Sequence, residues 1–109
     1  MPQEDERERA DLVSRYRQLV LRELPRRGAA ERWVVRADHC FGRIVLDHAV
    51  GRCWYEVLDR QGPPAFTQLD DERLRVAVEL AERIEQEGDP LLRRLNDQSL
   101  RWRGHPPVG

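Results

Sequence analysis

The 109-residue sequence contains no lysine, only two cysteines and three histidines, and few aromatic residues, which make up 6% of the chain. All 19 basic residues are therefore arginines. Selection for bidentate recognition would not explain the absence of lysine from every surface, so we attribute this absence to codon bias in a GC-rich genome. The net charge of −1 at pH 7 argues against a chain coated with basic residues for nonspecific binding to nucleic acid.

Motifs of the common enzyme and nucleotide-binding classes are also missing. The sequence has no phosphate-binding glycine loop, no dinucleotide fingerprint and no nucleophile elbow, and neither of its serines, Ser14 and Ser99, lies beside a convincing base. No apolar run approaches the roughly 18 residues of a membrane-spanning helix. The first residues, MPQEDERER, are unlike a signal peptide, so we expect a cytoplasmic protein without a membrane partner.

The residues that are present predict a folded, all-α chain. Hydrophobic residues make up 39% and charged residues 36%, and the apolar residues recur in periodic runs. The length suits one domain with a single core. We predict a small single-domain bundle of about four helices around a central apolar helix at residues 38–58, with a frayed N-terminus (1–5) and a C-terminal tail (104–109).

The central segment 38–58 contains the densest run of apolar residues in the chain, and it includes both cysteines. A helix with this sequence is apolar on most of its circumference, so other elements must cover it. Asp38 is a suitable N-cap residue. The alternative is a strand pair within residues 43–58 with a turn at Gly51, because this part is rich in β-branched and aromatic residues. Gly42 and Gly51 disfavour a helix interior, but they would allow another helix to approach closely.

The first predicted helix spans Gln3 to Leu24 and ends at Pro25, because proline interrupts a helix. Its apolar positions recur at spacings of three and four: Leu12, Val13, Tyr16, Leu19, Val20 and Leu24. Residues 29–37 are ambiguous and are treated as a connection. Residues 59–68 contain the sequence GlnGlyProPro, which predicts a surface loop.

The remaining two helices follow this loop. Asp70 is predicted to cap the first of them and Gly88 to end it, and its inward stripe consists of Leu74, Ala77, Val78, Ala81 and Ile84. Asp89 is then predicted to cap the last helix, with Pro90 in its first turn. Its apolar face consists of Leu91, Leu92, Leu95 and Trp102. The very short connection predicts an antiparallel or sharply angled pair of helices.

Several residues of the central segment could carry chemistry. His39, Cys40, Asp47, His48 and Cys53 are all potential metal ligands, but their spacing does not match a compact zinc site, so we predict no metal and no cofactor. Cys40 falls in the first helical turn, where backbone N–H groups would stabilise a thiolate, but we favour a buried and inert thiol because free cysteine is among the most buried residue types. Cys40 and Cys53 would lie roughly 20 Å apart on one helix, too far for a disulfide.

Arg43 and Asp47 are four residues apart and are predicted to form an ion pair, with a structural role as the simpler interpretation. One hypothesis for function is a small enzyme or catalytic accessory protein that uses Cys40, Asp47 and His48 together with the Arg43–Asp47 pair. Solvent access to Cys40, Asp47 and His48 from one open pocket would favour it.

The second hypothesis, which we prefer, is an interaction or regulatory module that binds a protein or nucleic acid partner. Residues 61–88 carry seven acids against three arginines, whereas residues 89–109 carry four arginines against two aspartates. Arginine beside an aromatic residue is suited to phosphates and bases, although a solvated helix end explains the same pattern. The predicted partner-binding residues are Arg93, Arg94, Arg101, Trp102 and Arg103.

Overall fold

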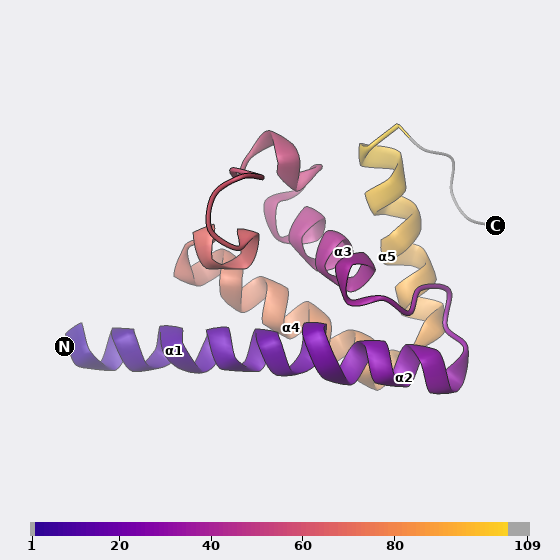
Figure 1. The fold of residues 1–109 in the computed structure, drawn as a ribbon, viewed down its shortest axis with the longest axis horizontal. Helices are drawn as coiled ribbons and strands as arrows, with labels where there is room; N and C mark the ends of the chain where they lie inside the picture. Colours follow the sequence, from indigo (N-terminus) through magenta and orange to yellow (C-terminus); the bar gives the residue numbers. More distant parts are fainter. Residues whose placement is uncertain (1, 105–109) are drawn as a thin grey trace.

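The computed structural model describes the backbone of residues 2–104 and the side chains of residues 5–104. All regular structure in this part of the chain is helical, which confirms the all-α prediction (Figure 1). The elements are α1 (Pro2–Gln18), the π-helix η1 (Leu19–Glu23), α2 (Leu24–Glu31), α3 (Asp38–Val50), the 3-10 helices η2 (Trp54–Glu56) and η3 (Ala65–Gln68), α4 (Asp71–Glu87) and α5 (Asp89–Trp102). Because α1, η1 and α2 form one continuous helix, the described residues contain four main helices.

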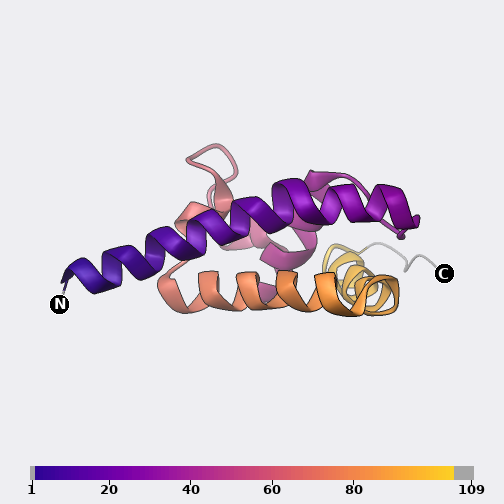
Figure 2. The ribbon, with the colours of Figure 1, turned by 90° about the horizontal axis from the view of Figure 1, so that it is seen from below.

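The long α1–η1–α2 helix and α4 lie side by side and run in the same direction (Figures 1 and 2). α3 contacts α2, η1, α4, α5 and η2, so it is central to the fold as predicted. α5 leaves α4 at a steep angle and packs against α3. No helix of the described part is long and apolar enough to cross a bilayer. α1 already begins at Pro2, within the segment predicted to fray, and all of the predicted tail except Gly104 lies outside the described residues.

The prediction that Pro25 ends the first helix is wrong. Proline lacks the N–H donor of a helical turn, and its ring crowds the carbonyl four residues earlier. Shortly before Pro25, Leu19–Glu23 adopt a wider π-helix, in which the N–H of Leu24 bonds to the carbonyl of Leu19. This local widening accommodates the ring, so the helix continues through Pro25 to Glu31. Arg32 then ends it in a left-handed conformation (φ 57°).

The predicted central helix at 38–58 is shorter in the structure, because α3 ends at Val50 and Gly51 follows it with φ 78°. Glycine adopts this left-handed conformation without steric cost, and so it terminates the helix. The strand pair considered for 43–58 is also wrong. Asp38 is the first residue of α3 rather than its cap; the cap position is Ala37, and the Asp38 carboxylate accepts the N–H of His39 at 2.7 Å.

The predictions for α4 are confirmed, since the Asp70 carboxylate accepts the N–H of Arg73 at 2.8 Å and Gly88 ends the helix. All five residues of its predicted inward stripe are buried. For α5, Gly88 occupies the cap position instead of Asp89. The Asp89 carboxylate accepts the N–H of Val34 at 2.7 Å and bonds to Arg93 at 2.6 Å, so it ties the loop after α2 to α5.

Candidate interaction surface

A buried carboxylate, Asp47, organises the contact between α3, α5 and the segment after α3. Asp47 has no exposed surface, and its oxygens accept hydrogen bonds from the backbone N–H of Trp54 at 2.9 Å and the hydroxyl of Ser99 at 2.6 Å. The Arg103 guanidinium completes the set with a bidentate pair at 2.8 and 3.0 Å. These bonds raise the pKa of Arg103 further above its ordinary value. A buried carboxylate with this many donors is fully compensated.

The predicted direct ion pair between Arg43 and Asp47 is wrong. The Arg43 guanidinium instead donates to the hydroxyl of Ser99 at 2.8 Å and to the amide oxygen of Asn96 at 2.6 Å. Ser99 therefore bridges Arg43 to Asp47. Burial lowers the pKa of the Arg43 guanidinium, and the nearby positive charge of Arg103 acts in the same direction.

The three residues of the catalytic hypothesis face different surroundings. His48 is half-buried against α5, where its Nε2 lies 2.9 Å from the carbonyl oxygen of Leu95, and burial lowers its pKa. Asp47, its neighbour in sequence, is fully enclosed by donors from other segments. Cys40 is partly exposed, and both it and the buried Cys53 are free thiols. No acid, base and nucleophile are brought together by these three positions. The described residues also contain no group of three or more side chains suited to hold a metal ion.

The predicted partner-binding residues of α5 divide into three groups. Arg94 and Arg101 are exposed. Arg93 is exposed but pairs with Asp89, whereas Arg103 is only 12% exposed because it binds Asp47. Trp102 is half-buried, and its ring meets that of His48 edge-on, with the ring centroids 4.9 Å apart.

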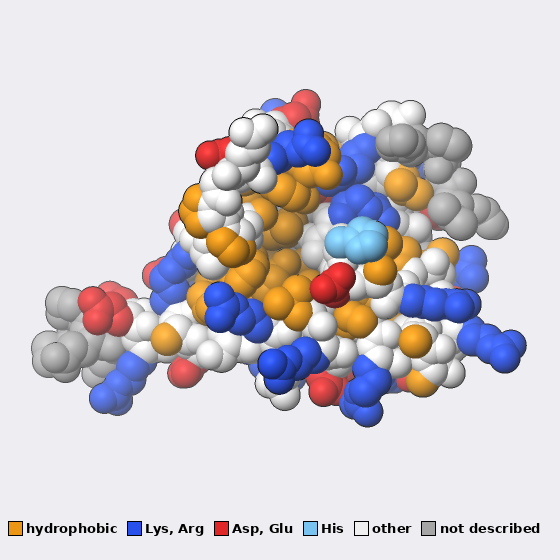
Figure 3. All heavy atoms as spheres, viewed as in Figure 1, with side chains coloured by type: hydrophobic (Ala, Val, Ile, Leu, Met, Phe, Trp, Pro, Cys, Tyr) orange, Lys and Arg blue, Asp and Glu red, His pale blue; other side chains and the backbone are white. Residues whose placement is uncertain are grey.

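A groove of about 400 Å³ lies beside α3, on the face of the molecule shown in Figure 3, where apolar surface is hollowed beneath an arch of the chain. Its sides come from three segments that are distant in sequence. The lining residues are Leu21 of η1, Asp38, His39, Gly42, Arg43 and Leu46 of α3, and Trp54 and Tyr55 of η2. Leu21 and Tyr55 expose 44% and 42% of their surface, which is unusual for large apolar side chains clustered around one depression.

Gly42 leaves the α3 backbone open at this groove. A Cβ placed on Gly42 would have only the Tyr16 hydroxyl as a neighbour, at an ordinary contact distance of 3.8 Å. Gly42 therefore provides space on the side of α3 that lines the groove, next to Tyr16 of α1. The close approach expected for this glycine is not made by any described helix.

The wall of the groove opposite Leu21 is fixed by the buried polar cluster. The N–H of Trp54 bonds to Asp47, and the Tyr55 ring lies against the guanidinium groups of Arg60 and Arg103, 3.8 and 4.5 Å from its centroid. The Trp54 and Tyr55 rings meet edge-on at 4.6 Å. A buried carboxylate of α3 thus positions two aromatic residues that the sequence gives no reason to associate with it.

Four arginines surround the groove, and within the described residues none makes an ion pair with a carboxylate: Arg17, Arg22, Arg43 and Arg60. Arg17 and Arg22 line an adjoining depression that shares Leu21 with the groove. Arg60 reaches it through its contact with Tyr55. The space-filling view shows arginine side chains on several sides of the apolar surface (Figure 3).

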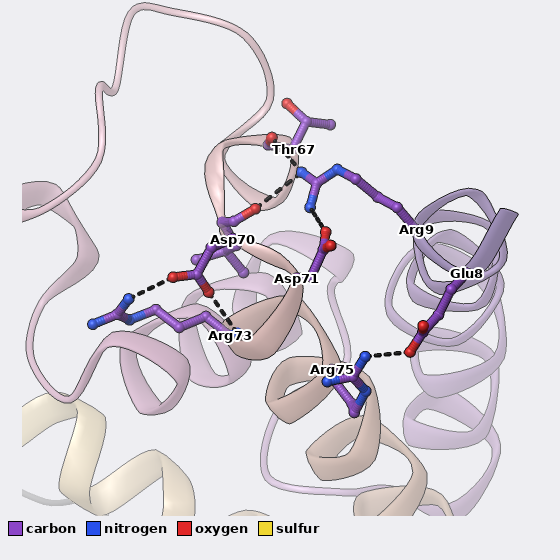
Figure 4. A network of polar contacts seen from close by, with 8 residues as sticks. Glu8, Arg9, Thr67, Asp70, Asp71, Arg73 and Arg75 are labelled. Carbon is purple, nitrogen blue, oxygen red and sulfur yellow. Dashed lines mark hydrogen bonds and ion pairs between the residues drawn. The ribbon is translucent and has the colours of Figure 1, made fainter. Parts of the chain in front are cut away.

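On the side of α1 that faces α4, the charged residues are paired. Arg9 bonds to Asp71 and to the backbone carbonyls of Thr67 and Leu69, and Arg75 of α4 pairs with Glu8 (Figure 4). Further along, Arg15 of α1 lies near two glutamates of α4, Glu82 and Glu85. Arg9 and Arg15 are thus paired towards α4, whereas Arg17 and Arg22 beside the groove have no carboxylate partner among the described residues, and Arg17 lies over the Phe66 ring at 5.5 Å from its centroid.

Comparisons with protein-family models, with curated proteins and with solved structures found no match to this chain.

Proposed function

We propose that this chain is a protein-binding module whose groove beside α3 receives apolar side chains of a partner protein. The observation that carries the proposal is the uncovered apolar wall: Leu21 and Tyr55 remain about half exposed next to the open backbone of Gly42. Monomeric proteins seldom leave apolar side chains gathered around one depression without a use for them. Their burial by a partner would gain the hydrophobic free energy that the isolated chain forgoes.

The geometry favours binding over catalysis. Cys40, Asp47 and His48 lie in separate surroundings, so they offer no nucleophile with an adjacent base. Besides the Tyr55 phenol, the ionisable side chains that line the groove are Asp38, His39 and Arg43, and Asp38 and His39 are largely exposed, at 58% and 83% of their side chains. Aromatic residues and arginine are enriched at protein interfaces, and this groove contains Trp54, Tyr55 and Arg43.

A displayed library of random peptides of about 18 residues, long enough for five helical turns, tests this proposal. Peptides selected on the full chain are measured against Gly42→Leu, whose added side chain projects into the groove, and against Gly42→Ala as the matched control. We expect binding to be lost in Gly42→Leu and retained in Gly42→Ala. Failure to select any peptide, or equal binding to Gly42→Leu, would overturn the assignment of the groove.

The exposed arginines of α5, Arg94 and Arg101, are the other candidate location for partner binding. The double variant Arg94→Gln with Arg101→Gln separates the two locations. If the partner binds in the groove, this variant binds the selected peptides as the unmodified chain does. A loss of binding there, with Gly42→Leu unaffected, would move the site to α5.

A further inference from the structure

We infer that the partner segment is an acidic amphipathic helix, which lies along α3 with its apolar side chains in the groove and its carboxylates against the surrounding arginines. This inference rests on the proposed function and names the chemistry of the occupant. Three features carry it: the unpaired cations around the groove, the length and openness of the α3 wall, and the surroundings of Arg43.

The charges around the groove complement an acidic segment. Arg17, Arg22 and Arg60 are exposed cations without a carboxylate partner in the described part of the chain. Two carboxylates line the groove and the neighbouring depression that shares Tyr55 with it. Asp38 lines the groove, but it is 58% exposed and already accepts the N–H of His39, while Glu56 lies in a neighbouring depression with Tyr55. The local balance is therefore positive although the whole chain has a net charge of −1. Complementary charge selects the sign of a partner and accelerates its association.

The shape of the groove suits a helix. Asp38, Gly42 and Leu46 follow one another at intervals of four residues and form one wall along α3. They span about 12 Å of the helix axis, and a partner helix with apolar anchors at i, i+3, i+4 and i+7 spans a similar distance. Because Gly42 has no side chain, the backbone of a helix can approach α3 closely there. The described residues contain no strand, so a partner cannot bind by extending a sheet in this region.

Arg43 gives the groove a half-buried cation at its base. Its hydrogen-bond acceptors on α5, the Ser99 hydroxyl and the Asn96 amide oxygen, are neutral, so they satisfy its donors without neutralising its charge. Arg103 adds further positive charge close by, although that charge is compensated by Asp47. A partner carboxylate near Arg43 would interact in a partly desolvated setting, where charge pairs are stronger than on an open surface.

Three labelled peptides of about 18 residues, or five helical turns, test the inference by fluorescence anisotropy. The first has leucines at i, i+3, i+4 and i+7 and glutamates on its other faces. The second has the same composition in a scrambled order that breaks the apolar stripe. The third keeps the stripe but has arginine in place of glutamate. A single-stranded oligothymidylate is measured beside them as a nucleic acid probe.

We expect the acidic amphipathic peptide to bind at least about tenfold more tightly than the other two peptides and to weaken as salt is raised from about 50 to 500 mM. The variant Arg17→Gln with Arg22→Gln should weaken its binding about fivefold to tenfold. The matched control, Arg73→Gln with Arg83→Gln on α4, changes the net charge equally and should alter binding by less than about twofold.

Tighter binding of the arginine peptide, or equal binding of the scrambled peptide, would overturn the acidic helix as the occupant. Stronger binding of the oligothymidylate, if lost in the Arg17→Gln and Arg22→Gln variant, would identify the face as a nucleic acid surface instead. The random-peptide selection separates this failure from failure of the proposed function. If selected peptides discriminate Gly42→Leu but are not acidic, the groove still binds proteins and only the inferred chemistry is wrong.

Discussion

The long helix formed by α1 and η1 has two sides that differ in how far their charged and apolar residues are satisfied by contacts within the chain. Towards α4, its arginines pair with carboxylates and backbone carbonyls (Figure 4). Towards the groove, Arg17 and Arg22 have no carboxylate partner among the described residues, and Leu21 between them is 44% exposed. The first side completes its interactions within the chain, whereas the second leaves cations and apolar surface available together.

This difference separates residues that stabilise the fold from residues available for binding. Substitutions on the α4 side should lower the free energy of unfolding, because they strand or remove groups that have partners. Substitutions on the groove side should change binding while leaving stability almost unaltered. The exception is Asp47, which lies under the groove wall and is fully buried.

The largest effect is expected for Asp47→Ala, which removes the one buried carboxylate that joins α3, α5 and η2. Arg103, Ser99 and the N–H of Trp54 would lose their common acceptor. Breaking a buried pair by removing one partner typically costs about 3 to 5 kcal/mol, and we expect a loss of this size in urea unfolding.

The variant Arg43→Met serves as the comparison for Asp47→Ala, because Arg43 does not bond to Asp47 directly and its replacement leaves all three donor groups of Asp47 in place. It should cost clearly less than Asp47→Ala. Equal costs for the two substitutions would contradict this arrangement. They would mean that Arg43 stabilises the cluster as strongly as the direct Arg43–Asp47 ion pair that the sequence predicted. If Asp47→Ala left the free energy of unfolding unchanged, the conclusion that this carboxylate is buried and hydrogen-bonded would be wrong.

A second contrast lies within η1 itself, where Leu19 is fully buried and Leu21 is 44% exposed. Leu19→Ala should lower the free energy of unfolding by about 2 to 5 kcal/mol through lost burial and a residual cavity. Leu21→Ala should change it by no more than about 0.5 kcal/mol but should weaken the binding of a selected peptide. Equal destabilisation by the two substitutions, measured by urea unfolding, would show that Leu21 belongs to the core.

The parts of the fold that the sequence predicts well are those whose signals are local. In α4, the cap at Asp70, the inward stripe and the terminal Gly88 all lie within one segment, and all were found in place. The predicted helix end at Pro25 was wrong, because a π-helical turn before Pro25 relieves the clash between its ring and the preceding turn. The local sequence pattern does not indicate that π-helical turn. Gly51 was correctly considered as a turn, but the residues after it form a 3-10 helix and not a strand.

The candidate groove could not be predicted, because its walls come from η1, α3 and η2. One signal was present: Leu21 stands outside the apolar stripe of the first helix, and such a leucine must be exposed or bound by something else. The polar cluster shows the same limit. Spacing alone pairs Asp47 with Arg43, but the donors Ser99 of α5 and Arg103, just after α5, come from more than 50 residues away. Long-range donors of this kind are invisible to helical periodicity.

Two helical glycines sharpen the contrast between closed and open surfaces. A Cβ on Gly28 of α2 would lie 2.8 Å from the carbonyl oxygen of Val35, whereas a Cβ on Gly42 meets only an ordinary contact. Gly28→Ala should therefore destabilise by about 1 to 3 kcal/mol because the backbone at 35–36 must move. Gly42→Ala should stabilise by about 0.5 to 1 kcal/mol through helix propensity. Thermal unfolding of both variants measures the difference, and a destabilising Gly42→Ala would mean that the groove is closed.

The smallest contrast concerns the arginines themselves. Arg9 makes three hydrogen bonds across to Asp71 and to two backbone carbonyls before α4, whereas Arg22 has no partner in the described part of the chain. Arg9→Ala should cost about 1 to 2 kcal/mol, because two carbonyls lose a charged donor, with some of the loss screened at its partly exposed position.

Arg22→Ala removes the same side chain and the same charge from the same long helix, so it controls for helix propensity and net charge in the Arg9→Ala measurement. We expect it to change the free energy of unfolding by less than about 0.5 kcal/mol. Urea unfolding at low and high salt gives a further check, because the ionic part of the Arg9 contribution should shrink at high salt while the Arg22 value stays near zero. Equal costs for the two substitutions would remove the distinction between the two sides of α1, since arginines of the groove side would then stabilise the fold as much as those that face α4.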